Sequence, residues 1–319
     1  MEKIYRQQVS LLLSVLPEVA KEKCFALHGG TAINLFVRDM PRLSVDIDLT
    51  YLPIEDRETS LKHIAEALER IKANIEKVIP GARITPRLNA GKLQISANKV
   101  DIKLEVNLVN RGCIAEPKEV SLCEKAQTTF EAFCTIPVVP VGQLFGGKII
   151  AALDRQHPRD LFDVKYLLGM EGFTQEIKEG FLLCLLCSDR PINEVIIPNF
   201  QDQRSALANQ FSGMTDETFS YEEYESIREK LVATIHENLT DSDREFLLSV
   251  KNIAPDWSIY NFQRFPAINW KLQNLQNLRN KNPEKHREQY EILKKKLKCP
   301  IPQSGVKALG TEPFRDQRS

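Results

Sequence analysis

Net charge, long hydrophobic runs and a disulfide pattern are all missing from this chain. Lysine plus arginine and aspartate plus glutamate both number 43, so no overall field attracts nucleic acid, and RNA binding would need a local basic patch. No apolar run approaches the roughly 18 residues of a membrane span, and the N-terminal segment lacks the small-residue cleavage site of a signal peptide. We therefore expect no membrane partner.

Cysteine usage favours a reducing compartment. The seven cysteines are odd in number and scattered, which is typical of reduced thiols in a cytoplasmic protein rather than of a disulfide framework. Cys184 and Cys187 lie in an apolar helical pattern over 181–187, with no second cysteine or histidine pair at zinc spacing nearby. We expect them to pack in the core rather than to bind a metal.

What the chain does contain is a pair of aspartates in a β-strand pattern over 42–51. Asp46 and Asp48 are two residues apart, so they lie on one face of the strand while the apolar residues between and beside them lie on the other. Two neighbouring like charges repel unless a cation lies between them, and Mg²⁺ prefers oxygen ligands. A magnesium site is one interpretation, and a solvated strand face is the other.

A glycine turn precedes this pair. A short buried strand over 24–27 is predicted to end at Gly29 and Gly30, and a helix is predicted to begin near Thr31. The free backbone N–H groups at a helix start form a site for anions. Metal-bridged carboxylates beside a turn suited to phosphates are the parts required for nucleotidyl transfer, although most glycine turns are only turns.

A third carboxylate follows on a later strand. Three strands are predicted over 82–87, 92–97 and 100–108, and in the last of them Glu105 lies on the polar face. If this strand neighbours the aspartate strand, Glu105 joins the pair. The alternative is a solvent-facing glutamate on an edge strand.

A second cluster of charges lies about a hundred residues downstream. One interpretation is a triphosphate clamp, in which Lys148 is a point charge and Arg155 or Arg159 a bidentate partner. Asp160 or Asp163 could then orient Lys148 or bind a metal-linked water. The alternative is a network of surface salt bridges on a helical hairpin, which would contribute little to stability. Pro158 is predicted to open the second helix of this hairpin.

These two segments together resemble the AbiEii/AbiGii (MenT-like) nucleotidyltransferase toxin family of bacterial toxin–antitoxin systems. The resemblance lies in His28-Gly29-Gly30-Thr31-Ala32 with 42–49, and in 148–155 with 158–163. It implies an α+β fold, with a DNA-polymerase-β-like nucleotidyltransferase domain that contains a mixed sheet, followed by an α-helical domain. We expect these domains over 1–138 and 139–298, with a Pro-flanked seam near 135–140 and a polar tail over 299–319.

The resemblance also assigns residues. It implies that Asp46 and Asp48 bind Mg²⁺, with Glu105 as a looser third ligand, and that Lys148 and Asp163 match the lysine and aspartate of the downstream motif. The backbone of Gly29 and Gly30 and the hydroxyl of Thr31 would hold the phosphates of an NTP. Lys148, Arg155, Arg159 and Asp160 complete the expected nucleotide site. The family further implies a type IV-like toxin with a cognate antitoxin, and some members serve in phage defence.

The acceptor of the nucleotide stays open at this level. Related MenT toxins transfer nucleotides to the 3′ end of tRNA, so an RNA acceptor is expected. A small molecule or a protein is the alternative acceptor, and an inert partner-binding module is the alternative of another class. A basic helix predicted over 281–298 could contact RNA phosphates or could simply be solvated. Further helices are predicted over 141–168, 175–187, 221–237, 240–249 and 270–279.

Overall fold

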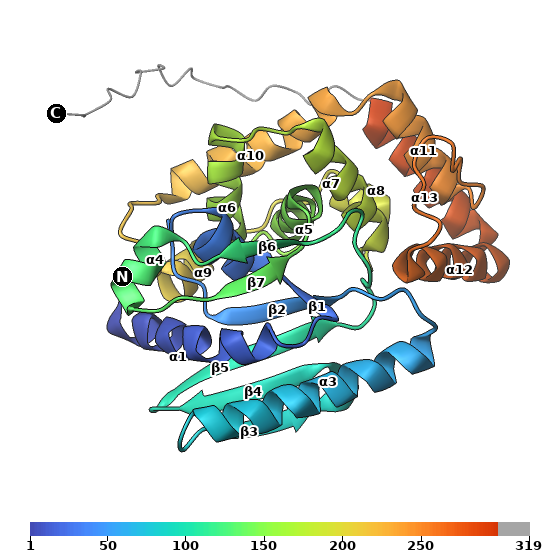
Figure 1. The fold of residues 1–319 in the computed structure, drawn as a ribbon. Coiled ribbons are helices and arrows are strands. Elements are labelled where there is room, and N and C mark those ends of the chain that lie inside the picture. The colour runs from blue at the N-terminus through green and yellow to red at the C-terminus, as the bar shows by residue number, and fades with distance from the viewer. Residues whose placement is uncertain (299–319) are drawn as a thin grey trace.

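The computed structural model describes residues 1–298 and contains a mixed sheet beside a helical half (Figure 1). The seven described strands lie in the order β3-β4-β5-β2-β1-β7-β6. In chain order they are β1 Phe25–His28, β2 Asp46–Tyr51, β3 Arg83–Arg87, β4 Lys92–Ala97, β5 Val100–Asn107, β6 Lys118–Ser121 and β7 Thr135–Val138. The β2–β5 and β1–β7 pairs are parallel, and the other pairs are antiparallel.

One face of the sheet is apolar because hydrophobic residues alternate along its strands. In β5, Ile102, Leu104 and Val106 are buried, while the alternate residues are partly or fully exposed. Two long helices cover the apolar face: α1 (Lys3–Val19) packs on β5, and α3 (Arg57–Val78) packs on β3 and β4 (Figure 1). The Asp56 side chain caps α3 by accepting a hydrogen bond from the Thr59 N–H. The polar face of β3 to β5 is left open.

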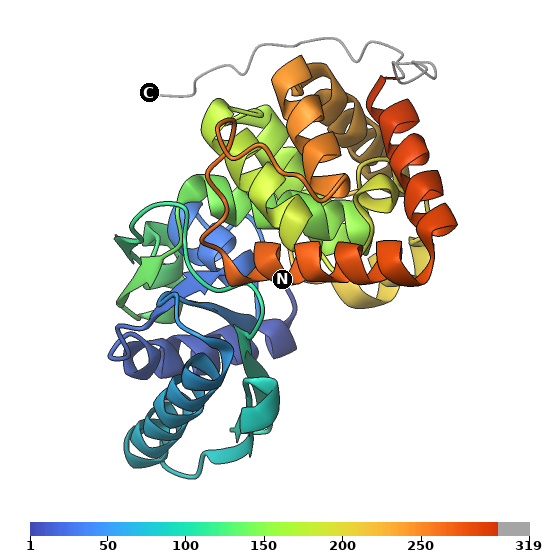
Figure 2. The same ribbon diagram turned by 90° about the vertical axis from the view of Figure 1, so that its right-hand side faces the viewer.

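The remaining helices form the other half of the molecule (Figure 2). The larger ones are α5 Val141–Asp154, α6 Pro158–Gly169, α7 Gln175–Cys187, α10 Tyr221–Asn238, α11 Asp241–Lys251, α12 Pro266–Lys281 and α13 Pro283–Lys298. Shorter segments are α2 Gly29–Thr31, which continues as the π-helical segment η1 Ala32–Val37, together with η2 Leu88–Ala90, α4 Glu124–Phe130, α8 Ile192–Val195, α9 Arg204–Ala206 and η3 Leu207–Phe211. Within residues 1–298, no helix combines the length and the apolar character needed to cross a bilayer.

Helices α5 and α7 cross at unusually short range. A Cβ atom at Gly180 of α7 would overlap the backbone of Gly142 in α5, and a Cβ at Gly146 would overlap the backbone of Gly180. The two helices therefore touch backbone to backbone. Cys184 lies on α7 near this crossing, and burial raises the pKa of its thiol to about 12. This environment agrees with the expected packing role of the cysteine.

Most predicted elements are confirmed, with one difference near the expected site. The strand predicted over 42–51 begins only at Asp46, because residues 42–44 turn inward and are buried. The Pro-flanked strand expected at the seam is confirmed as β7, which pairs with β1 in the sheet. The domain boundary at 138/139 stays a prediction, and the tail expected over 299–319 lies outside the described residues.

Candidate active site

The two aspartates lie on the open, polar face of β2. In the register of the sheet, Asp48 lies opposite His28 of β1 on one side and Glu105 of β5 on the other, while Asp46 lies beside Lys103. Burial and the neighbouring Asp46 charge raise the pKa of Asp48 to about 6. The chain thus holds two carboxylates close enough to repel each other, as expected for a cation site.

The glycine turn packs directly against Asp48. Gly29 has a φ of +73°, and a Cβ atom at this position would lie 2.5 Å from Asp48 Oδ2. Only glycine fits both the left-handed backbone and this close approach. The start of the helical segment 29–37, with its free N–H groups, therefore adjoins the aspartate pair.

Thr31 lies differently from the expectation that its hydroxyl holds a phosphate. Its side chain is fully buried, and its hydroxyl donates to the Asp46 backbone carbonyl at 2.5 Å. Because this hydroxyl is used inside the protein, it connects the glycine turn to β2 rather than facing solvent beside the aspartates.

A buried ionic network joins the turn to the helical half. Arg42 donates to both carboxylate oxygens of Asp163, at 2.7 and 2.5 Å, and the Asn34 side chain donates to the same carboxylate at 3.0 Å. The Lys148 ammonium of α5 lies 2.8 Å from Asp160 and 2.9 Å from Asp163, and both of these aspartates are 1% exposed. Asp163 is thus enclosed and positions Lys148 and Arg42.

Asp160 is held by cations on two sides. Burial alone would raise the pKa of Asp160, but Lys148 and Arg155 hold it well below its usual range. Arg155 makes a two-point contact with Asp160, at 2.6 and 2.9 Å. Arg159, at the start of α6, instead reaches the Asp46 carboxylate at 3.8 Å. The two arginines therefore have different partners. Arg155 binds the buried Asp160, whereas Arg159 lies near the Asp46 carboxylate of the aspartate pair.

Glu105 lies beside Asp48 in the sheet but has two lysine partners. Its carboxylate lies 2.8 Å from Lys92 and 2.8 Å from Lys103. Burial alone would raise the pKa of Glu105, yet hydrogen bonds from Lys103 and Lys92 keep it below its usual range. Within residues 1–298, no group of three or more His, Cys, Asp or Glu side chains converges as a metal site. The expected third ligand is therefore adjacent to the pair without joining it.

The family of this chain follows from a match over most of its length. The sequence model described as nucleotidyl transferase AbiEii toxin, type IV toxin–antitoxin system, matches residues 10–274. The chain belongs to this family. It is accordingly a nucleotidyltransferase toxin of the AbiEii kind. No curated protein sequence matches the chain.

A solved nucleotidyltransferase toxin shares the fold. The structure of MenT4, the nucleotidyltransferase toxin Rv2826c from Mycobacterium tuberculosis H37Rv, superposes with a TM-score of 0.57. The match covers 85% of this chain and 93% of that one at 14% sequence identity. At this identity the likeness establishes the α+β nucleotidyltransferase fold and leaves substrate and acceptor to the site itself.

The donor set of this AbiEii enzyme fits a divalent cation. Asp46 and Asp48 present oxygen ligands from one strand face, and the raised pKa of Asp48 reflects a charge that a cation would offset. The glycine turn lies against the same carboxylate. Phosphate oxygens could complete the coordination that two carboxylates leave open.

Two residues of this site were not assigned a role from the sequence. His28 is half-buried opposite Asp48, and burial together with Lys148 lowers its pKa to about 4, so it is neutral at pH 7. Arg42 is the bidentate partner of Asp163. The position of His28 next to Gly29 was the only signal for the first, and no sequence pattern pairs Arg42 with a residue 121 positions away.

Proposed function

We propose that this AbiEii enzyme is a Mg²⁺-dependent nucleotidyltransferase that acts in the cytoplasm on an RNA acceptor, the 3′ end of a tRNA. The observation that carries the proposal is the contact between the glycine turn and Asp48, which joins a phosphate site to a carboxylate pair. A cognate antitoxin, as the family implies, would oppose the toxin. The cysteines of the described residues are all unpaired, in keeping with a reducing compartment.

The roles of the residues follow from their placement. Asp46 and Asp48 would hold the metal, which when bound offsets negative charge on the reacting phosphates. The backbone N–H groups at Gly29 and Gly30 would bind the phosphate tail of the NTP, and the guanidinium of Arg159 faces the same space. Lys148 donates to Asp160 and lies in contact with Asp163, so it would bring a fixed positive charge to the edge of that space.

Asp163, Asp160 and Thr31 are proposed as positioning residues. Each is almost fully buried and bonded within the protein. Glu105 is proposed to orient the acceptor through its two lysines rather than to remove a proton, because a carboxylate with a lowered pKa is a weak base. Pyrophosphate would leave when the acceptor hydroxyl attacks the α-phosphate.

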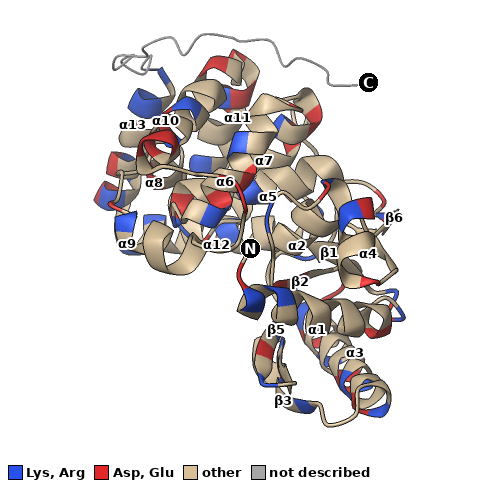
Figure 3. Cartoon of the chain, turned by 90° about the vertical axis from the view of Figure 1, so that its left-hand side faces the viewer, with Lys and Arg blue, Asp and Glu red and all other residues tan. Residues whose placement is uncertain are grey.

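The open face of the sheet supports a nucleic-acid acceptor. One row of paired residues runs across it from Asp48 through Glu105 and Lys92 to Arg87. Strand spacing places Arg87 about 14 Å from Asp48. Arg83 lies on the same face, and both arginines are exposed. The basic residues of β3 and of α13 are visible in Figure 3. Cations at this distance could hold RNA phosphates while the 3′ end reaches the aspartates.

The test is transfer of label from each α-³²P-labelled NTP to total RNA, total protein or small molecules. We expect label in RNA with Mg²⁺, none with a chelator, and a loss of several orders of magnitude in the Asp46→Ala variant. Asp101→Ala, on the same face at the far end of β5, is the matched control. Circular dichroism checks that both variants fold. Label in protein or small molecules alone would assign the alternative acceptor. Undiminished transfer by Asp46→Ala would refute the proposed role of the aspartate pair in nucleotide transfer.

A further inference from the structure

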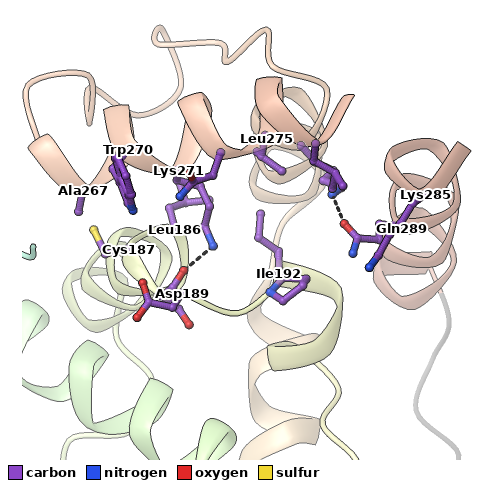
Figure 4. A pocket seen from close by; sticks show the side chains of 15 residues that line it. Leu186, Cys187, Asp189, Ile192, Ala267, Trp270, Lys271, Leu275, Lys285 and Gln289 are labelled. Carbon is purple, nitrogen blue, oxygen red and sulfur yellow. Dashed lines mark hydrogen bonds between the residues drawn. The ribbon is translucent and has the colours of Figure 1, made fainter. Parts of the chain in front are cut away.

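A second pocket lies in the helical half, away from the aspartates. It has a volume of about 200 Å³ and lies where the C-terminal end of α7 meets α12 and α13 (Figure 4). Its apolar lining includes Leu186, Ile192 and Leu275, and Trp270 is exposed over half of its surface at the margin. None of the nucleotide-site residues lines this pocket.

Two buried lysines, Lys251 and Lys271, are among the residues that line this pocket. Lys251, the last residue of α11, is 2% exposed, and its ammonium donates to Gln289 Oε1 at 2.7 Å. Lys271 of α12 is 8% exposed and donates to the backbone carbonyls of Ser188 and Arg190. Both lysines line the pocket, and Figure 4 labels Lys271 together with Gln289, the partner of Lys251.

Neither lysine has an acidic partner in the part of the chain that the structure describes. No carboxylate of residues 1–298 lies within salt-bridge distance of Lys251 or Lys271, although Asp189 lines the same pocket. Burial and the nearby Lys271 lower the pKa of Lys251 to about 8. Buried charges are normally paired, because removing an ion from water is costly. Two buried ammoniums that have only neutral acceptors and line one pocket give it a positive charge that a bound anion would offset.

We propose that this pocket binds a phosphate group between Lys251 and Lys271. Lysine ammoniums bind phosphate as point charges, and the lining holds three lysines (Lys251, Lys271 and Lys285) against one carboxylate (Asp189), so the net charge of the pocket is positive. At about 200 Å³ the pocket is below the roughly 300 Å³ of sites for drug-sized ligands, so it suits one phosphate group rather than a whole nucleotide. Trp270 at the margin offers a surface on which a nucleic-acid base can stack.

The phosphate has two possible sources, free phosphate and a phosphodiester of RNA, and Trp270 can report on both. The chain has only two tryptophans, so the Trp257→Phe background leaves Trp270, next to the pocket, as the single tryptophan for selective excitation at a wavelength that tyrosine does not absorb. In this background, sodium phosphate titrated at constant ionic strength should change the fluorescence saturably. An oligoribonucleotide of about ten nucleotides, titrated in parallel, should do so only if the pocket takes a phosphodiester.

Two variants and one control make the result specific. Lys251→Met should weaken phosphate binding by about tenfold or more. Gln289→Glu places a carboxylate beside Lys251, and it should raise the melting temperature and remove the phosphate response. Lys295→Met, an exposed lysine of α13 outside the pocket, should leave the response unchanged.

The two probes and the Gln289→Glu variant distinguish a phosphate site from its absence. A response to phosphate alone, to the oligonucleotide alone or to both, lost in Gln289→Glu, supports the site and assigns the source. A Trp270 signal that neither probe changes, or a response that persists in Gln289→Glu, overturns it. Nucleotide transfer is not required for the readout, so the result is independent of the proposed acceptor.

Discussion

Replacing Asp48 with asparagine should stabilise the metal-free protein at neutral pH while removing nucleotide transfer. Burial and the Asp46 charge raise the pKa of Asp48 from 3.8 to about 6. Each unit corresponds to about 1.4 kcal/mol, so the ionised Asp48 costs the folded state about 3 kcal/mol at pH 7. Asparagine has nearly the same shape and carries no charge. We therefore expect the free energy of unfolding to rise by up to about 3 kcal/mol.

The pH dependence gives the sign of the effect. Below about pH 4 the carboxyl group is protonated in both the folded and the unfolded chain, so wild type and variant should be equally stable. Between about pH 4 and 6 the unfolded chain releases its proton first, and the wild type loses stability as the pH rises. The difference should be complete above about pH 7. Urea unfolding followed by circular dichroism at several pH values, with a chelator present, measures it.

Glu105→Gln is the matched comparison. Lys103 and Lys92 keep the pKa of Glu105 below its usual range despite its burial, so the ionised form contributes stability at neutral pH and loses it as the pH falls. This variant should therefore be less stable than the wild type at pH 7. If Asp48→Asn is neutral or destabilising at pH 7, the reasoning about the carboxylate pair is refuted.

Three further changes test the site. Gly29→Ala should cost about 1–3 kcal/mol of stability and weaken the binding of a fluorescent NTP. The reason is that Gly29 has a φ of +73° and that an added Cβ would lie 2.5 Å from Asp48. Unchanged NTP binding would contradict the role of this contact. Arg42→Met should lower the free energy of unfolding by about 3–5 kcal/mol, because it removes the bidentate partner of buried Asp163, and a loss below about 1 kcal/mol in urea would argue against the network. Arg83→Glu with Arg87→Glu should weaken tRNA binding and flatten its salt dependence, whereas Lys294→Glu with Lys295→Glu on α13 should not; the reverse result would move the RNA surface to the basic helix.

Local patterns predicted the parts of this site better than their contacts. Alternation along 46–49 and 101–108 correctly placed Asp46, Asp48 and Glu105 on polar faces, because side-chain direction in a strand depends only on position. The preference of proline for the first turn of a helix correctly predicted that α6 begins at Pro158.

Local sequence patterns could not predict which residues far apart in the sequence contact each other. Lys92 approaches Glu105 through the register of β4 with β5, and Arg42 meets Asp163 across 121 positions of sequence. The buried position of Thr31 likewise depends on how the turn packs on β2. Of the basic helix 281–298, His286, Leu293 and Leu297 are buried and Lys296 donates to two backbone carbonyls, so part of its charge is directed inward.

The glycine crossing of α5 and α7 fixes the position of the helix that carries Lys148 by direct backbone contact. Because the two backbones touch, no side chain of intermediate size sets the separation of these helices. Next to this crossing, α5 meets His28 at Gly147, where a Cβ would lie 2.7 Å from His28 Nε2. The helix that carries Lys148 is thus held by two close contacts, one with the backbone of α7 and one with His28. We therefore expect substitutions of hydrophobic residues elsewhere in the helical half to leave the Lys148 charge in place.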